Sequence, residues 1–257
     1  MGSMQIRSNE DPVSQSSFNE RAEQLLPRIE YRLLVSPTDR LQAFQMRYEA
    51  YLREGAVEAN DSQSFSDADD DLGNSYIFGV FLDGTLASSI RVHVAVAPDD
   101  CLPSARVFPD VLLPPLRSGR RIQDPTRFVL SEAVAGKIPE MPLLTLRTVW
   151  LLGEHFEVDM SLAAVRAEHR AFYMRTCGHK PVSDARPYPM LNKPIVCLSA
   201  DFQTMKERNY QRFPFLRSTP QERAELLRPV RAAAHPAYRG SGTMSFLTAG
   251  AVSDALR

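Results

Sequence analysis

Residues Tyr76–Val96 read YIFGVFLDGTLASSIRVHVAV and set the architecture expected for the chain. The first half of this stretch is almost wholly apolar, Asp83-Gly84 is a strong hairpin turn, and the second half alternates apolar and polar side chains. The pattern predicts two antiparallel strands. In the second strand, one face carries Ile90, Val92, Val94 and Val96, and the other carries Ser89, Arg91 and His93.

On both sides of this hairpin, strand patterns alternate with helix patterns. Residues 29–35 resemble a strand, and Ser36 opens a helix to about Arg53 with Leu41, Phe44, Tyr48 and Tyr51 as its apolar stripe. Downstream we expect strands at 127–130, 158–165, 181–187 and 195–198, and helices at 140–155, 166–177 and 202–210. Two long connections, 54–74 and 98–124, show no regular pattern. This order predicts an α/β fold with a mixed, mostly antiparallel central sheet flanked by helices.

The composition is that of a folded soluble protein. The chain has 257 residues, 44% of them hydrophobic, and a net charge of -1, so no global field attracts nucleic acid. We expect no membrane-spanning segment, a cytoplasmic location, and no metal site, because the three cysteines have no CxxC spacing and suit buried thiols. We predict a flexible lead over 1–17, one domain over 18–230 and a flexible tail over 231–257.

Several short strings resemble two related enzyme families. The first half carries the motifs Arg47-Tyr-Glu-Ala-Tyr51, Ser66-Asp-Ala-Asp-Asp70, Ser89-Ile-Arg91 and Asp124-Pro-Thr-Arg-Phe128. They resemble the signature of autoinducer (acyl-homoserine lactone) synthases. The second half carries His169-Arg-Ala-Phe-Tyr173, Gly178 and Arg186-Pro-Tyr-Pro-Met-Leu-Asn-Lys-Pro194. It is closer to the long-chain N-acyl amino acid synthases. The resemblance covers about 29–202.

The resemblance implies an acetyltransferase-like (GNAT-like) fold and an acyltransferase. It implies acyl carrier protein as partner, with the acyl-phosphopantetheine of that protein as the donor substrate and no bound cofactor. It leaves the acceptor amine open.

The first group of candidate residues is a charged cluster that binds substrate. Arg47 lies on the apolar side of its helix, where an unpaired guanidinium would be costly, so we expect an acidic partner, with Asp67 and Asp70 the nearest candidates. Arg91 is either solvent-exposed or part of the same cluster, which the family comparison favours. The alternative is that Arg47 only extends toward solvent and the aspartates form a solvated loop. The resemblance adds Tyr51 to the substrate-binding set.

The second group consists of candidate catalytic residues. Asp124 takes the place where the related synthases carry a glutamate, and a carboxylate there could accept the proton of the attacking amine. Arg127 is expected to pair with Asp124 or an acidic loop residue, and Phe128 to line a tunnel for the acyl or pantetheine chain. Tyr173 stands where relatives place a tyrosine that protonates the leaving thiolate, although a buried core tyrosine explains it equally.

The choice of donor rests on an absence. Coenzyme A carries a pyrophosphate, which such folds bind at a Gly-rich turn before a helix, and the segment 130–137 has one glycine and no such repeat. A carrier protein is therefore the expected donor. Its acidic surface would need a basic patch, and the candidates are Arg117, Arg120, Arg121 and Arg170, with Arg166 and Arg175 nearby.

The sequence thus predicts an N-acyltransferase that joins a medium- or long-chain fatty acyl group from acyl carrier protein to the α-amine of an amino acid. One alternative is an acyl-homoserine lactone synthase that uses S-adenosylmethionine; against it, Val57 lies near the place of an expected tryptophan. A non-catalytic carrier-binding module is the alternative from another class. We also expect Arg47→Ala and Arg91→Ala to abolish turnover while leaving the thermal midpoint within a few degrees.

Overall fold

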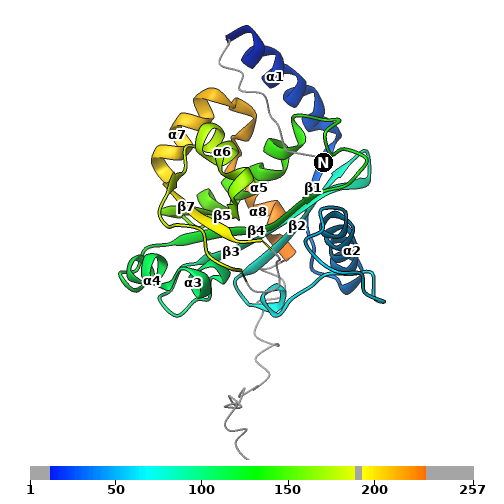
Figure 1. Ribbon diagram of the computed structural model, residues 1–257. Helices are drawn as coiled ribbons and strands as arrows, with labels where there is room; N and C mark the ends of the chain where they lie inside the picture. The colour runs from blue at the N-terminus through cyan, green and yellow to red at the C-terminus, as the bar shows by residue number, and fades with distance from the viewer. Residues whose placement is uncertain (1–11, 189–192, 230–257) are drawn as a thin grey trace, which may run out of the picture.

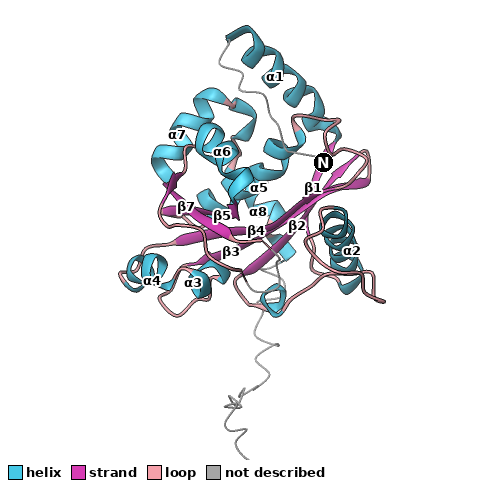
Figure 2. Cartoon of the chain, viewed as in Figure 1, coloured by secondary structure: helices cyan, strands magenta, loops and turns pink. Residues whose placement is uncertain are grey.

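The computed structural model describes residues 12–188 and 193–229, and its seven strands form one sheet in the order β1-β2-β3-β4-β5-β7-β6 (Figure 2). The strands are β1 (Ile29–Leu33), β2 (Ser75–Leu82), β3 (Thr85–Ala95), β4 (Ile122–Leu130), β5 (Met160–Arg166), β6 (Lys180–Pro181) and β7 (Ile195–Asp201). The helices are α1 (Pro12–Leu25), α2 (Pro37–Arg53), α3 (Pro103–Val107), α4 (Pro109–Arg117), α5 (Met141–His155), α6 (Arg170–Phe172), α7 (Phe202–Arg212) and α8 (Pro220–Leu226). All strand pairs are antiparallel except β4–β5, which confirms the predicted mixed sheet.

The β2–β3 hairpin forms as the sequence predicted. Asp83 and Gly84 both adopt positive φ (50° and 80°), as a two-residue hairpin turn requires. Ile90, Val92 and Val94 are buried in the main core, which also contains much of α5. The opposite face of β3 places Ser89, Arg91 and His93 in the interior as well, so both faces of this strand are buried.

Helices cover both faces of the sheet. Figure 1 shows α1, α5, α6 and α7 on one side and α2, α3 and α4 on the other. Helix α5 is the centre of the first layer: almost every side chain along it is buried, including that of Trp150. None of the described helices is long and apolar enough to cross a membrane.

Several expectations about local structure were wrong. The connection 98–124 contains α3 and α4, and β4 starts at Ile122 rather than at 127. The helix expected over 166–177 is broken into a 3₁₀ turn, the short α6 and a π-helix, Tyr173–Cys177. The strand expected over 181–187 is reduced to β6 and one bridge, Arg186 to Ile195.

Two expectations about burial also fail. Leu41 is 46% exposed, and the buried stripe of α2 consists of Ala43, Met46, Arg47, Tyr48 and Ala50. Cys101 is exposed, while Cys177 and Cys197 are buried as expected.

The composition of the two ends of the chain predicted a flexible lead and a flexible tail. Helix α1 begins at Pro12, within the segment expected as a flexible lead, and its Phe18 and Ala22 belong to the main core. The earlier part of that lead and the expected tail over 231–257 lie outside the described residues.

The parallel pair β4–β5 opens like a wedge. The two strands pair only at Ile122–Met160 and Gln123–Ser161, and beyond these positions no ladder joins them within the described sheet. Backbone N–H and C=O groups along the diverging edges are therefore available to another extended chain. Asp124 is the first residue past the last pair, so it stands at the apex of the wedge.

A β-bulge in β4 lies just beyond the apex. Ser89 of β3 faces Val129, and Arg91 faces Thr126, so β4 carries one more residue than β3 over this interval. Arg127 adopts a positive φ of 54°, an uncommon conformation for a residue with a side chain. The bulge turns the Arg127 side chain toward the charged face of the sheet.

Candidate active site

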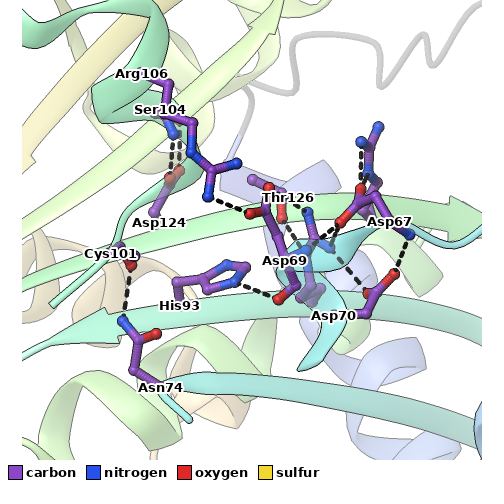
Figure 3. A network of polar contacts seen from close by, with 12 residues as sticks. Asp67, Asp69, Asp70, Asn74, His93, Cys101, Ser104, Arg106, Asp124 and Thr126 are labelled. Atoms are coloured by element: carbon purple, nitrogen blue, oxygen red, sulfur yellow. Dashed lines mark hydrogen bonds and ion pairs between the residues drawn. The ribbon is translucent and has the colours of Figure 1, made fainter. Parts of the chain in front are cut away.

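The loop after α2 presents three aspartates to the sheet. Residues Ala68–Asp71 form a 3₁₀ turn closed by a capping box: Asp67 accepts hydrogen bonds from the turn's backbone, and the Asp70 carboxylate accepts one from Asp67 N at 2.9 Å. This Asp-x-x-Asp spacing explains why part of an acidic stretch is ordered. Figure 3 shows Asp67, Asp69 and Asp70 together beside Thr126 of β4 and His93 of β3.

Three arginines that are distant in the sequence converge on these carboxylates. Arg47 Nη1 lies 2.8 Å from Asp70 Oδ1. Arg91 Nη1 lies 2.5 Å from Asp67 and 3.0 Å from Asp70. Arg127 Nη2 lies 2.6 Å from Asp67 Oδ2. The acidic partner of Arg127 is thus the loop residue Asp67, one of the two alternatives left open by the sequence.

The cluster is buried. The side chains of Arg47 and Arg91 are fully buried, and that of Asp67 is 7% exposed. Although desolvation opposes ionisation of Asp67, hydrogen bonds and charges from Arg91 and Arg127 lower its pKa far below the usual range. Truncation of one partner in such a pair leaves a buried charge uncompensated. The burial contradicts the surface position from which Arg47→Ala and Arg91→Ala were expected to spare stability, and we now expect both variants to be less stable.

The guanidinium of Arg127 lies between two aromatic rings. Its Cζ atom is 4.9 Å from the centroid of Phe65 and 5.8 Å from that of Tyr188. Tyr51 packs edge-to-face on Phe65 at 5.2 Å. Tyr51 therefore belongs to this wall, and its role in substrate binding stays a prediction.

Asp124 lies on the same face but outside the ion-pair cluster. Ser104 donates two hydrogen bonds of 2.8 Å to it, from backbone N and from Oγ, as Figure 3 shows. The carboxyl group is fully buried, and desolvation raises its pKa to about 6 despite these two bonds and the charge of Arg91. A carboxylate with a pKa near neutrality at the apex of the wedge suits a general base.

Sequence reasoning missed five neighbours of the site. Asp69 pairs with Arg106 of α3 at 2.6 Å, and its backbone carbonyl accepts a 2.9 Å hydrogen bond from His93 Nε2. Ser104 anchors Asp124, and Phe65 and Tyr188 enclose Arg127. Asp69 and Tyr188 stand inside the quoted motifs, which was the available signal. Ser104 and Arg106 lie in the connection 98–124, whose sequence shows no regular pattern and so gave no signal.

The other face of the wedge holds a small cavity. Its wall includes Pro125, Ser161, Trp150, Tyr173 and His179, and its volume of about 10 Å³ suits one water molecule. Tyr173 is half-buried, and desolvation raises its pKa above the usual value of 10. Phe128 packs against the main core. Phe128 was expected to line a tunnel for the acyl or pantetheine chain; it is not in the wall of this cavity, which is far too small to be that tunnel.

The expected basic patch is divided. Arg121 N donates to Asp159, just before β5, so Arg117, Arg120 and Arg121 lie near the beginning of that strand. Arg170 follows the end of β5, which at seven residues is roughly 20 Å away. The wedge opens toward the end of β5, so Arg170 and not the 117–121 group lies on its open side.

A mixed, mostly antiparallel sheet flanked by helices is the fold of GNAT-like N-acyltransferases, and the chain is an acyltransferase of this class. Residues 42–201, more than half of the chain, match the family model of the N-acyl amino acid synthase FeeM. The chain belongs to the FeeM family of N-acyl amino acid synthases. No curated protein matches it in sequence.

Solved structures with the same fold include FeeM from uncultured soil microbes, with a TM-score of 0.60 and 17% identity over 72% of this chain and 97% of that chain. TofI, in complex with an inhibitor and MTA, has a TM-score of 0.52 and 12% identity over 74% of this chain and 100% of that one. MesI, a CoA-dependent acyl-homoserine lactone synthase, has a TM-score of 0.50 and 17% identity over 72% of this chain and 95% of that one. These likenesses show the fold.

Proposed function

We propose that the protein transfers a medium- or long-chain fatty acyl group from the phosphopantetheine thioester of acyl carrier protein to the α-amine of an amino acid. The observation that carries this proposal is the position of Asp124. It stands at the apex of the wedge with a buried arginine–aspartate cluster beside it on the same face. The acceptor occupies the charged face, and the donor arm enters between β4 and β5.

The charged face suits an acceptor with a carboxylate. Arg47 Nε and Nη2 and Arg91 Nη2 are buried and have no hydrogen-bond partner among the described residues. Each unpaired buried donor costs about 1–3 kcal/mol, which a carboxylate brought in by the acceptor recovers. The aromatic wall of Tyr51, Phe65 and Tyr188 offers packing to the acceptor's side chain.

In the reaction, the acceptor attacks as the neutral amine, and ionised Asp124 accepts the proton that its nitrogen loses as the bond to the thioester carbonyl carbon forms. Backbone N–H groups on the unpaired edge of β4 stabilise the oxyanion; Pro125 contributes none because it has no N–H. When the carbon–sulfur bond breaks, Tyr173 protonates the pantetheine thiolate. The products are an N-acyl amino acid and free carrier thiol.

The segment before α5 supports a carrier protein over coenzyme A. The backbone N–H groups of Ser131, Val134, Ala135, Lys137 and Ile138 are all used in hydrogen bonds to backbone carbonyls. The N-cap of α5 is a buried glutamate, Glu140, paired with Arg21 at 2.6 Å. A pyrophosphate would thus find few free donors and a carboxylate at this helix N-terminus.

A direct assay tests the proposal. The purified protein is incubated with dodecanoyl thioesters of acyl carrier protein or coenzyme A and a pool of amino acids, and products are identified by mass spectrometry together with free thiol. We expect N-acyl amino acids, with the carrier thioester preferred. A lactone product from S-adenosylmethionine would assign the autoinducer-synthase activity instead, and thiol release without an amide would contradict acyl transfer.

The acceptor carboxylate is tested separately with an amino acid and its methyl ester. The methyl ester lacks the carboxylate that the arginine–aspartate cluster is proposed to bind, so its kcat/KM should be at least 100-fold lower than that of the amino acid. Equal rates for both acceptors would refute the role assigned to the arginines.

The carrier surface is tested with charge reversals. Arg170→Glu should raise the KM for the carrier thioester at least fivefold and leave that for acyl-pantetheine unchanged, because only the protein partner contacts this residue. Arg120→Glu, at the other end of β5, is the matched control. Equal effects of the two variants would remove Arg170 from the docking surface.

A further inference from the structure

The open end of the wedge holds an arginine that the proposed reaction does not use. Arg166 is the last residue of β5, and its side chain is 16% exposed. Its guanidinium donates hydrogen bonds to the Glu54 carboxylate and, over 2.8 Å, to Nε2 of His169. An arginine has no acceptor, so His169 accepts this bond as a neutral ring, and burial and the charge of Arg166 lower its pKa.

The ion pair of Arg166 and Glu54 crosses the mouth of the wedge. Glu54 directly follows α2, whose Met46 and Ala50 pack on Val129 near the end of β4. Arg166 ends β5, on the other side of the opening. The Glu54 side chain is 41% exposed, and an ion pair in such a position contributes little to stability. Another anion can therefore replace the carboxylate of Glu54 at small cost.

The charges around Arg166 leave room for one added anion once Glu54 has moved. A second carboxylate, Glu168, lies 3.4 Å from Arg166 Nε and 3.6 Å from Lys193 Nζ. With Glu54 in place, two cations face two carboxylates. Without it, one positive charge is uncompensated, which is the charge that a phosphodiester neutralises.

The distance from Arg166 to the apex of the wedge matches the length of the donor arm. Ser161 is the last residue of β5 paired to β4, and the five positions from there to Arg166 span about 16 Å at 3.3 Å per residue. At roughly 3.6 Å for every three bonds, as in an extended peptide, a 4′-phosphopantetheine arm of about 13 bonds spans about 15 Å from phosphorus to sulfur. A thioester at the apex beside Asp124 therefore places the phosphate of its arm next to Arg166.

We propose that Arg166 binds the phosphate of 4′-phosphopantetheine, the group that acyl carrier protein and coenzyme A share, and that the Glu54 carboxylate occupies this place in the free protein. The inference rests on the proposed function and names a residue that binds the donor. The segment before α5 offers the phosphate few partners, because its backbone N–H groups are already bonded. When the arm enters, Glu54 turns toward solvent and Arg166 exchanges one anion for another.

Two small donors that differ only in the phosphate test the site: S-dodecanoyl-4′-phosphopantetheine and S-dodecanoyl-pantetheine. With a pool of amino acids as acceptors, wild type should show at least a tenfold higher kcat/KM for the phosphorylated donor. Arg166→Met keeps an unbranched stem and removes the charge, so this ratio should fall toward one. Equal rates for both donors in wild type, or an unchanged ratio in Arg166→Met, would overturn the assignment.

Glu54→Gln separates phosphate binding from a structural role of the ion pair. Loss of the competing carboxylate should lower the KM for the phosphorylated donor at least twofold and leave that for S-dodecanoyl-pantetheine unchanged. A purely structural pair predicts instead that Glu54→Gln and Arg166→Met impair both donors alike. Arg28→Met, which breaks an exposed ion pair with Asp83 beside the edge strand β1, is the control and should keep the wild-type ratio. A higher KM for the phosphorylated donor in Glu54→Gln would refute the exchange of anions.

The source of the phosphate is tested with the dodecanoyl thioesters of acyl carrier protein and coenzyme A. Arg166→Met should lower kcat/KM for the carrier thioester at least tenfold, as with the small phosphorylated donor. A loss confined to the coenzyme A thioester would assign Arg166 to the nucleotide part of that donor and overturn the proposal.

The phosphate site and the proposed function fail in different ways. Amide formation with equal use of both small donors removes the phosphate site and leaves the proposed function standing. Calorimetric binding of 4′-phosphopantetheine that is lost in Arg166→Met, without amide formation from any donor, does the reverse.

Discussion

Replacement of Asp124 by asparagine should make the protein more stable and nearly inactive. In the folded state the pKa of Asp124 is raised to about 6, against an ordinary value of 3.8, because the carboxyl is fully buried. A raised pKa means that folding favours the protonated form. The stabilising contribution is complete below about pH 4 and is lost as the pH rises through 6.

The magnitude follows from the shift. About two pKa units correspond to about 3 kcal/mol at neutral pH, which is the upper limit for the gain on removing the charge. Asparagine is isosteric, and its carbonyl and amide can still bond the backbone N–H and Oγ of Ser104. A gain of 1–3 kcal/mol raises the thermal midpoint of a domain of this size by roughly 3–10 °C.

The assay is thermal unfolding of wild type and Asp124→Asn at pH 4, 6 and 7.5, with kcat/KM over the same range. The midpoint difference should be near zero at pH 4 and grow through pH 6, while kcat/KM of the variant falls about 10²–10⁴-fold. Wild-type activity should rise with pH through about 6. Asp110→Asn is the control. Asp110 is an exposed carboxylate whose pKa is lowered to about 2, mainly by a hydrogen bond from Arg186. Removal of its charge should therefore not raise the thermal midpoint at high pH. A less stable Asp124→Asn at pH 7.5, or a difference independent of pH, would refute the reasoning.

Three further substitutions test the surroundings of the site. Arg91→Ala should lower the free energy of unfolding by about 3–5 kcal/mol in urea titrations, because it leaves buried carboxylates without their partner; a loss below 1 kcal/mol would contradict the burial. Gly153→Ala should lower the thermal midpoint by several degrees, since a Cβ there would lie 2.2 Å from the buried ring of Phe202. Gly73→Ala is its control: a Cβ at Gly73 would meet no atom within 4 Å, so the midpoint should change little. Tyr173→Phe should lower kcat about 100-fold with a carrier thioester and less with a donor whose thiol is more acidic, and an equal loss with both donors would exclude proton transfer to sulfur.

The sequence by itself determined the elements with strong local signals. The β2–β3 hairpin follows from an apolar run, Asp83-Gly84 and an alternating strand, and α5 follows from its long apolar pattern with proline in its first turn. The family also followed from sequence: the quoted motifs resemble those of the two related synthase families, and the family model matches residues 42–201. These features depend on neighbours in the chain, so a single sequence contains them.

The tertiary structure decided which of the charged residues meet. Arg47, Arg91 and Arg127 are on three different elements, and their common partner is a turn whose order depends on the pairing of Asp67 with Asp70. The choice of Asp67 over Asp124 as partner of Arg127 depends on a one-residue bulge in β4, which no side-chain pattern encodes. Likewise, α3 and α4 contain four prolines, two of them inside α4, so the local sequence disfavours a helix there. Packing of Phe108, Leu112 and Leu116 into a core with β4, β5 and β7 outweighs that propensity and places Ser104 on Asp124.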